Sequence, residues 1–262
     1  MTMELSNDQF IYRTHLEQYV GTEQEIVIPE GVAVINHRAF CNSTSNITAV
    51  TFPSTIEEID NDAFRDCTNL KTLFFPLKVK RLTLGCETFS NCTALQSVHL
   101  PEGTDAIWST FIGCTALSDI TLPDSIRCIG GFAFKNCISL KKAKLPANLA
   151  YISRNSFQGC TGLTEIAIPE GIKDIEEYAF QNCESLQNVQ IPNGVTHIGE
   201  EAFAGCKQLS CICIPDSVTY IGKEAFSGCA KGFVLQSSNP KWKSYARKEK
   251  LKFELVDDPH TK

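Results

Sequence analysis

The sequence predicts a solenoid of stacked coils with a parallel β-ladder, and three periodic features carry this prediction. Phenylalanine returns every 22 to 25 residues, cysteine follows it by three residues in eight of the nine units, and proline keeps the same step. A unit of about 23 residues is too short for a strand, a full helix and two connections, but it suits one coil of a solenoid. The nine phenylalanines are Phe40, Phe64, Phe89, Phe111, Phe134, Phe157, Phe180, Phe203 and Phe226.

The first half of each unit has the pattern of a short, half-buried strand. In the unit from 163 to 183, Ile166 and Ile168 alternate with Glu165 and Ala167, so the isoleucines face the interior and the other two face outward. Pro169 then ends the strand, because proline has no N–H to donate to a ladder. Stacked coils place equivalent strands side by side at ~4.8 Å.

The second half of the unit predicts another extended piece and a helical turn. Ile172 and Ile175 form a second inward set. Four residues before the phenylalanine come residue types that tolerate a positive φ, which predicts a left-handed backbone at this position. The residue directly before each phenylalanine is small, as close packing between coils requires. The residues four before the phenylalanine in these units are Asn36, Asp60, Gly85, Gly130, Gly199 and Gly222.

The thirteen cysteines follow the repeat and therefore indicate packing rather than a disulfide framework. Free cysteine behaves as a small, buried hydrophobe, and a column of thiols favours a reducing compartment. No Cys-x-x-Cys pair occurs and the five histidines lack ligand spacing, so no metal site is predicted. Cys86 and Cys128 are extra thiols without an identified partner. Cys211 and Cys213 are predicted to share one exposed face as ordinary thiols, with a redox or metal pair as the alternative.

The two ends of the chain are predicted to cap the solenoid, since terminal coils would otherwise expose their core. Residues 1–23 supply an N-terminal cap with apolar residues at partly helical spacing, and 24–235 hold about nine coils plus a last strand at 233–236. Residues 236–262 supply a C-terminal cap with a helix over 241–250, a strand over 251–256 and a frayed tail. The window 241–252 holds six basic residues and one acid, interpreted as the solvated face of the cap helix, with an anion-binding patch as the alternative.

These residues resemble the BspA-like class of leucine-rich repeats over roughly residues 24–235. The shared pattern comprises the leucine, the strand ending in Ile-Pro, the second apolar pair, the Ala-Phe step and the cysteine. The resemblance implies a right-handed, curved solenoid with its parallel sheet on the concave face, and short 3-10 or helical turns and short strands elsewhere. It also implies protein-binding, adhesin-like roles, often at microbial surfaces.

The strand residues that face outward form the candidate binding surface on the predicted concave face. Their chemistry varies between units while the inward residues stay fixed, which indicates freedom from the packing constraint. Phe74 stands out as an aromatic residue at an outward position, with His99 on the next strand. The candidate residues are Thr72, Phe74, Ser97, His99, Asp119, Thr121, Lys142, Lys144, Glu165, Asn188 and Gln190.

The composition and motifs favour a non-catalytic protein-binding module, which we expect to be a monomer that binds one other protein. The net charge of −6 argues against nucleic acid as a partner, and no apolar run is long enough to span a membrane. Without a phosphate loop, nucleophile elbow or His-Glu-x-x-His motif, no catalytic residue, enzymatic activity or cofactor is predicted.

Alternatives of function and location stay open. A carbohydrate-binding surface requires exposed aromatic residues in a row, and a thiol-based sensor requires an accessible cysteine of low pKa. The N-terminus shows no apolar signal region, so with the many thiols a cytoplasmic location is favoured. A secreted or cell-surface location is the alternative if a signal has been removed.

Overall fold

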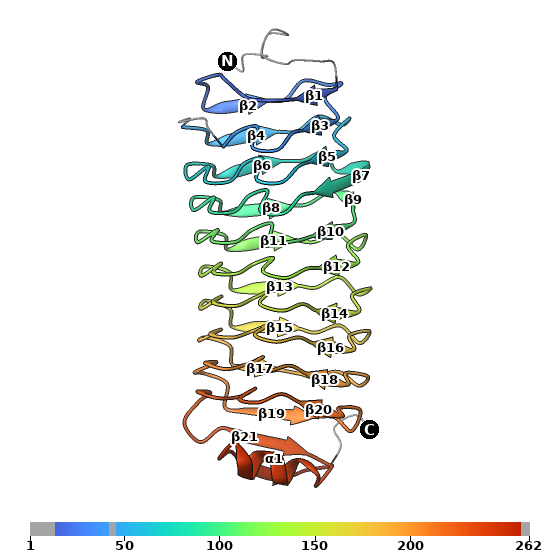
Figure 1. Cartoon of the computed structure of the whole chain (residues 1–262), viewed down its shortest axis with the longest axis vertical. Helices are drawn as coiled ribbons and strands as arrows, with labels where there is room; N and C mark the ends of the chain where they lie inside the picture. Colours follow the sequence, from blue (N-terminus) through green and yellow to red (C-terminus); the bar gives the residue numbers. More distant parts are fainter. Residues whose placement is uncertain (1–13, 42–45, 258–262) are drawn as a thin grey trace.

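The chain forms a solenoid of about ten coils, stacked along one long axis (Figure 1). The structure is a computed structural model, and it describes residues 14–41 and 46–257. Each coil contributes a strand to a first ladder and another, usually of two residues, to a second ladder. The predicted parallel-strand solenoid is therefore confirmed.

The first ladder follows the leucine of each unit and consists of parallel strands, hydrogen-bonded in three consecutive sheets that divide between residues 121 and 142 and between 189 and 211. Each strand buries its middle residue and turns its flanking residues outward, as Ile166 between Glu165 and Ala167 shows. Glu165 pairs with Lys142 on one side and with Asn188 on the other, so equivalent residues form columns across the coils. The strands are β2 (Glu25–Val27), β4 (Ala49–Thr51), β6 (Thr72–Phe74), β8 (Ser97–His99), β11 (Asp119–Thr121), β13 (Lys142–Lys144), β15 (Glu165–Ala167), β17 (Asn188–Val189), β19 (Cys211–Ile214) and β21 (Val234–Ser237).

The second ladder lies beside the first, to its right in Figure 1, and corresponds to the predicted second extended piece. Most of its strands have two residues, of which the second is a buried isoleucine or leucine. The strands are β1 (His15–Leu16), β3 (Val34–Ile35), β5 (Glu58–Ile59), β7 (Lys78–Leu84), β9 (Glu102–Thr104), β10 (Ala106–Ile107), β12 (Cys128–Ile129), β14 (Tyr151–Ile152), β16 (Asp174–Ile175), β18 (His197–Ile198) and β20 (Tyr220–Ile221).

A continuous column of stacked aromatic rings runs through the interior. It begins at Tyr19, passes through all nine repeat phenylalanines and ends at Phe233, with ring centroids 4.3 to 5.8 Å apart. The phenylalanines are almost fully buried. Stacked aromatic pairs contribute about 0.5–1.5 kcal/mol each beyond the area they bury. This column ties each coil to the next.

The repeat cysteines pack beside the rings and also act as hydrogen-bond donors. The Sγ of Cys160 donates to the carbonyl oxygen of Phe134 at 3.1 Å, and Cys137 donates to Phe111 at the same distance. Each of the eight cysteines bonds in this way to the phenylalanine of the preceding coil. The prediction of a packed column is confirmed, and the periodic cysteine also gives a second donor to a carbonyl oxygen such as that of Phe134, which already accepts from the Cys137 N–H.

The left-handed backbone occurs at a different position from the predicted one, so that prediction is wrong. Positive φ values fall two residues before each phenylalanine, as at Glu224 (φ 55°), and not four residues before it. Gly199 and Gly222, at the predicted position, serve close approach instead: a Cβ on Gly199 would lie 2.5 Å from the backbone nitrogen of Glu177. The predicted 3-10 or helical turn is a series of i→i+3 turns, because left-handed residues interrupt it.

The ends differ in detail from the predicted caps. Residues 15–23 already belong to the solenoid, since β1 pairs with β3 and Tyr19 takes the place of a repeat phenylalanine. Val20 is exposed rather than buried, and the apolar residues at 10–12 lie outside the described residues. The C-terminal cap comprises β21, the helix α1 (Trp242–Lys248) and β22 (Lys252–Leu255), which pairs with β21. The predicted helix is thus three residues shorter than expected.

Candidate functional site

The outward side of the first ladder, here called the first-ladder face, holds all eleven candidate residues on one continuous surface. Ten of them lie on strands β6, β8, β11, β13, β15 and β17, and Gln190 follows β17 directly. Nine are exposed, and Thr72 and Ser97 on adjoining strands are half-buried, as is their equivalent Ala49. In-register pairing brings the candidates together as neighbours, although it does not test whether they bind anything.

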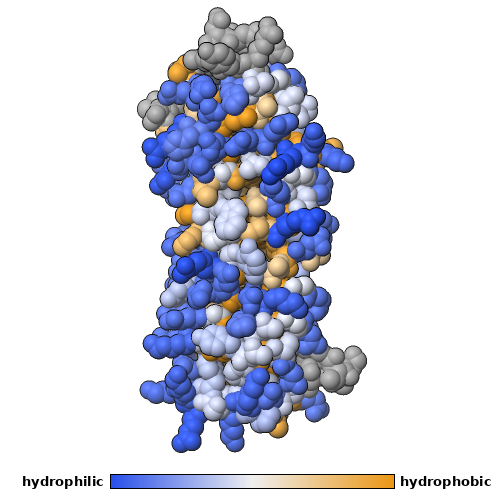
Figure 2. All heavy atoms as spheres, turned by 45° about the vertical axis from the view of Figure 1, so that its right-hand side comes forward, coloured by the Kyte–Doolittle hydropathy of each residue, from blue (hydrophilic) through white to orange (hydrophobic). Residues whose placement is uncertain are grey.

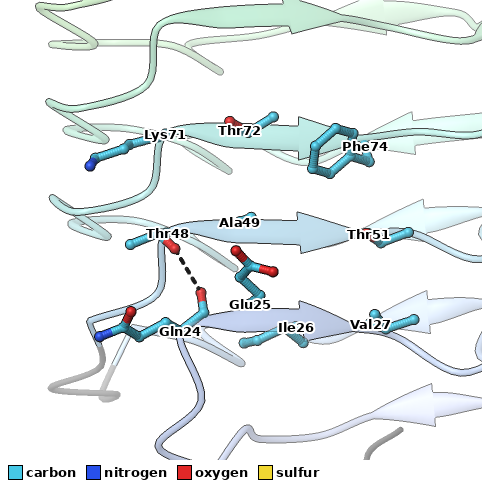
Figure 3. Close-up of a pocket in the computed structure, with 10 residues that line it drawn as sticks. All are labelled: Gln24, Glu25, Ile26, Val27, Thr48, Ala49, Thr51, Lys71, Thr72 and Phe74. Carbon is cyan, nitrogen blue, oxygen red and sulfur yellow. Dashed lines mark hydrogen bonds between the residues drawn. The ribbon is translucent and has the colours of Figure 1, made fainter. Parts of the chain in front are cut away.

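Phe74 forms one wall of a hollow at the N-terminal part of this face (Figure 3). The hollow has a volume of about 490 Å³ and is lined by outward residues of β2, β4 and β6, among them Val27 and Thr51. Phe74 lies in register with Thr51 and keeps 53% of its surface exposed. Lys71 and Glu25 place opposite charges at the edge of the same hollow. An apolar side chain of a partner could therefore be bound beside Phe74.

His99 and Thr121 continue the face toward the C-terminus through a hydrogen bond across neighbouring strands. The His99 Nδ1 lies 2.9 Å from the Thr121 Oγ1. The next strand, β13, carries Lys142 and Lys144, and the Lys142 ammonium pairs with the Glu165 carboxylate of β15 at 2.5 Å. Such exposed pairs contribute little to stability, so these groups can exchange partners at small cost. The middle of the face is thus polar and charged, whereas the hollow beside Phe74 is partly apolar.

The second ladder carries an outward row of polar and aromatic side chains that the sequence analysis did not single out. Cys128 Sγ lies 3.5 Å from the Tyr151 hydroxyl, and the His197 Nδ1 lies 3.1 Å from the Asp174 carboxylate. The His197 and Tyr220 rings are 5.9 Å apart. Figure 2 shows this side of the molecule, where charged side chains surround a narrow strip of more apolar residues. In the sequence, these outward side chains can be found as the residue directly before the buried isoleucine that ends each two-residue strand.

The thiols of the repeat cysteines stay protonated at neutral pH and are therefore poorly reactive. Burial raises the pKa of the Cys114 and Cys160 thiols to about 12, and it raises that of Cys137 and Cys183 well above the ordinary value. A thiol that holds its proton at neutral pH is a poor nucleophile and a poor metal ligand. Among the described residues, no group of three or more histidines, cysteines or carboxylates could hold a metal ion.

Cys211 and Cys213 share the outward side of β19 as predicted, whereas Cys128, expected to have no partner, lies beside the Tyr151 hydroxyl. Cys211 is exposed and Cys213 half-buried on the outward side of β19, and Cys86 is exposed while Cys128 is half-buried. The thirteen cysteines all lie within the described residues, and none of them forms a disulfide. In the part of the chain that the structure describes, no helix has the length and hydropathy that crossing a membrane requires.

Comparison with solved structures gives bacterial leucine-rich repeat proteins as neighbours. A leucine-rich repeat protein from Bacteroides ovatus shares 26% identity with a TM-score of 0.69, over 97% of this chain and 74% of that one. The T. pallidum leucine-rich repeat protein shares 23% identity with a TM-score of 0.61, over 97% and 99%. The pneumococcal vaccine antigen PcpA shares 18% identity with a TM-score of 0.53, over 93% and 75%. No protein of curated function matches the sequence.

The family model for the BspA-type leucine-rich repeat region matches residues 18–109 and 108–232 with six copies. The match begins at 18, in agreement with the half-coil that β1 and Tyr19 form before residue 24. It spans the aromatic column, the cysteine column and the first-ladder face. The chain therefore belongs to the family of BspA-type leucine-rich repeat proteins.

Proposed function

We propose that the protein is a non-catalytic interaction module that binds another protein through its first-ladder face. The observation that carries this proposal is the contrast between the two sides of each strand: the inward residues repeat with little change, whereas the outward ones differ from coil to coil. A rigid solenoid holds these varied side chains in fixed register, which reduces the entropy lost on binding. The hollow beside Phe74 provides an anchoring point.

The chemistry of the face supports a protein partner over a carbohydrate. A hot spot in a protein interface combines an exposed aromatic residue with a surrounding ring of polar groups, as Phe74 does with Thr51, Thr72 and Lys71. A glycan surface on this face would need several exposed aromatic residues in a row. Phe74 is the single aromatic residue in the outward columns of β2 to β19.

The thiol-based sensor receives less support than the interaction module. The repeat cysteines are buried and their pKa values are raised by burial, whereas sensing requires an accessible thiolate. We also propose that the protein works in a reducing compartment, because thirteen cysteines without disulfides are maintained most easily there. Fractionation of cells with an antibody to the chain tests this location; recovery from the cell surface would contradict it.

Site-resolved crosslinking tests the proposed face. A photoreactive amino acid is placed at Phe74, His99 or Lys144 on the first ladder. The exposed controls are Lys173 and Thr219, which directly precede strands β16 and β20 of the second ladder. Crosslinks to one common protein are expected at the three face positions, and excess unmodified chain should compete them away. The same protein crosslinked only at the control positions would refute the proposal.

A further inference from the structure

The C-terminal cap concentrates positive charge on a chain that is acidic elsewhere. Residues 241–252 hold six of the 24 basic residues and one of the 30 acidic ones, which leaves 18 basic and 29 acidic residues in the rest of the chain. A local excess of this size raises the concentration of anions near the surface by its electrostatic potential. The basic residues are Lys241, Lys243, Arg247, Lys248, Lys250 and Lys252.

The inner side of α1 is anchored to the last coil, so the backbone that carries the outer side chains is held in one position. Trp242 and Ala246 are buried against the solenoid. The Tyr245 hydroxyl donates to the carbonyl oxygen of Gly222 at 2.9 Å, and the Lys241 ammonium donates to that of Val218 at 2.8 Å. The cations on the outer side are therefore carried by an anchored element.

The cations on the outer side of the cap have no carboxylate partner. Some basic side chains elsewhere pair with acids, as Lys207 does with Glu184 at 2.7 Å, whereas others, such as Lys71 and Lys144, form no ion pair with a described residue, so the cap is distinguished by how many cations it gathers in one place. Lys243, Arg247 and Lys248 are exposed and form no ion pair with any residue that the structure describes. Their charge is thus available to an external anion.

The same cations surround a hollow of about 700 Å³ on the surface of the cap. Its lining also includes Pro240, Lys241 and the Ser244 residue. Ser244, Arg247 and Lys248 are three and four residues apart on α1, a spacing that puts them on one side of the helix. The hollow is open, and four of its six lining residues are cationic, so a chain of repeated negative charges can contact several cations at once.

We propose that this basic cap face binds a linear anionic polysaccharide carrying carboxylate or sulfate groups. Arg247 supplies a planar guanidinium that matches such oxyanions, and the lysines supply point charges beside it. Single-stranded nucleic acid is disfavoured, because Trp242 is buried and the Tyr245 hydroxyl is held by Gly222, which leaves no free ring for base stacking. A flat membrane or a broad duplex fits a hollow less well than a narrow chain does.

Fluorescence anisotropy with a labelled heparin octasaccharide tests this proposal on the full chain. The test variant is Arg247→Glu with Lys248→Glu, and the matched control is Lys78→Glu with Lys80→Glu, two exposed residues on β7. Both doubles change the net charge by the same amount. Circular dichroism and thermal melting confirm that each variant is folded.

The expected result is binding of the octasaccharide that weakens at least about tenfold in the cap variant and less than about twofold in the control. The affinity should also fall steeply as the salt concentration rises from about 0.05 to about 0.3 M, because salt screens the attraction between exposed charges. Equal losses in both variants, or no binding at low salt, would overturn the proposal. Duplex DNA, a poly-glutamate peptide or phosphatidylserine vesicles bound as tightly as the octasaccharide would overturn the assignment to a polysaccharide.

Discussion

Replacement of Phe157 by alanine tests the aromatic column most severely. Phe157 is fully buried at the centre of the solenoid, with its ring 5.2 Å from that of Phe134 and 5.4 Å from that of Phe180. Truncation of a buried phenylalanine to alanine costs about 3–5 kcal/mol, and this figure includes the loss of the two stacked pairs. Since total stabilities are about 5–15 kcal/mol, the loss is a large share of the free energy of unfolding.

Urea unfolding followed by far-UV circular dichroism measures the effect. A loss of about 4 kcal/mol should lower the urea midpoint by about 1–2 M, given the urea dependence of unfolding for a chain of this size. Tryptophan fluorescence adds spatial information, because the chain's two tryptophans, Trp108 and Trp242, lie on opposite sides of Phe157 along the solenoid. Contacts in a solenoid are limited to neighbouring coils, so a central defect can uncouple its two halves.

Phe74→Ala is the matched control for this experiment. It removes the same side chain from an exposed position, where substitution changes stability by about 0.5 kcal/mol or less. Phe157→Leu should fall between the two, because it retains apolar volume and loses the stacked rings. Equal destabilisation by Phe157→Ala and Phe74→Ala would refute the idea that the stacked rings connect the coils.

Three further predictions concern the thiols and the backbone. Burial raises the pKa of the Cys114 and Cys160 thiols to about 12 from an ordinary 9.0, so folding favours the protonated thiol. The free energy of unfolding should therefore be unaffected by these groups below pH 9 and fall as the pH rises toward 12. Thiol labelling of the native protein at pH 8 should reach the exposed Cys86 and Cys211 but not the repeat cysteines. Labelling of all thirteen cysteines in the folded protein would contradict this. Cys160→Ala should cost about 0.5–1.5 kcal/mol in chemical unfolding because it removes the thiol bond to the Phe134 carbonyl, which keeps its bond from the Cys137 N–H, whereas Cys211→Ala should be nearly neutral. Glu224→Gly should stabilise the protein by about 0.5–1 kcal/mol in thermal unfolding, since Glu224 has a φ of 55°, which glycine adopts more readily. Lys223→Gly, the matched control, should destabilise the protein. A loss of stability in both variants would refute the assignment of strain to Glu224.

The sequence predicts the inward half of this fold well because packing repeats it. Leu163, Ile166 and Phe180 recur at one period, and a buried position tolerates few alternatives. The turn was predicted less well. Glu224, although not glycine, takes a positive φ because its place in the coil sets the backbone, and Gly199 is required by the approach of Glu177 rather than by its own φ.

The candidate site divides in the same way. The alternation along each strand places Phe74, Lys142 and Glu165 on the outward side, which the structure confirms. The ligand of this face could not be predicted, because the outward residues are not constrained by packing and therefore follow no pattern that repeats between coils. The row formed by Tyr151 and His197 was missed for a related reason: two-residue strands carry too short a pattern to indicate which side chains face out.

Lysine footprinting of the complex tests the central claim most directly. The chain is acetylated with and without the protein captured by site-resolved crosslinking, and each lysine is quantified by mass spectrometry. We predict that the partner protects Lys71, Lys142 and Lys144 on the first-ladder face, whereas Lys173 and Lys207 remain equally reactive. Protection of Lys173 and Lys207 with the three face lysines unchanged would contradict the account.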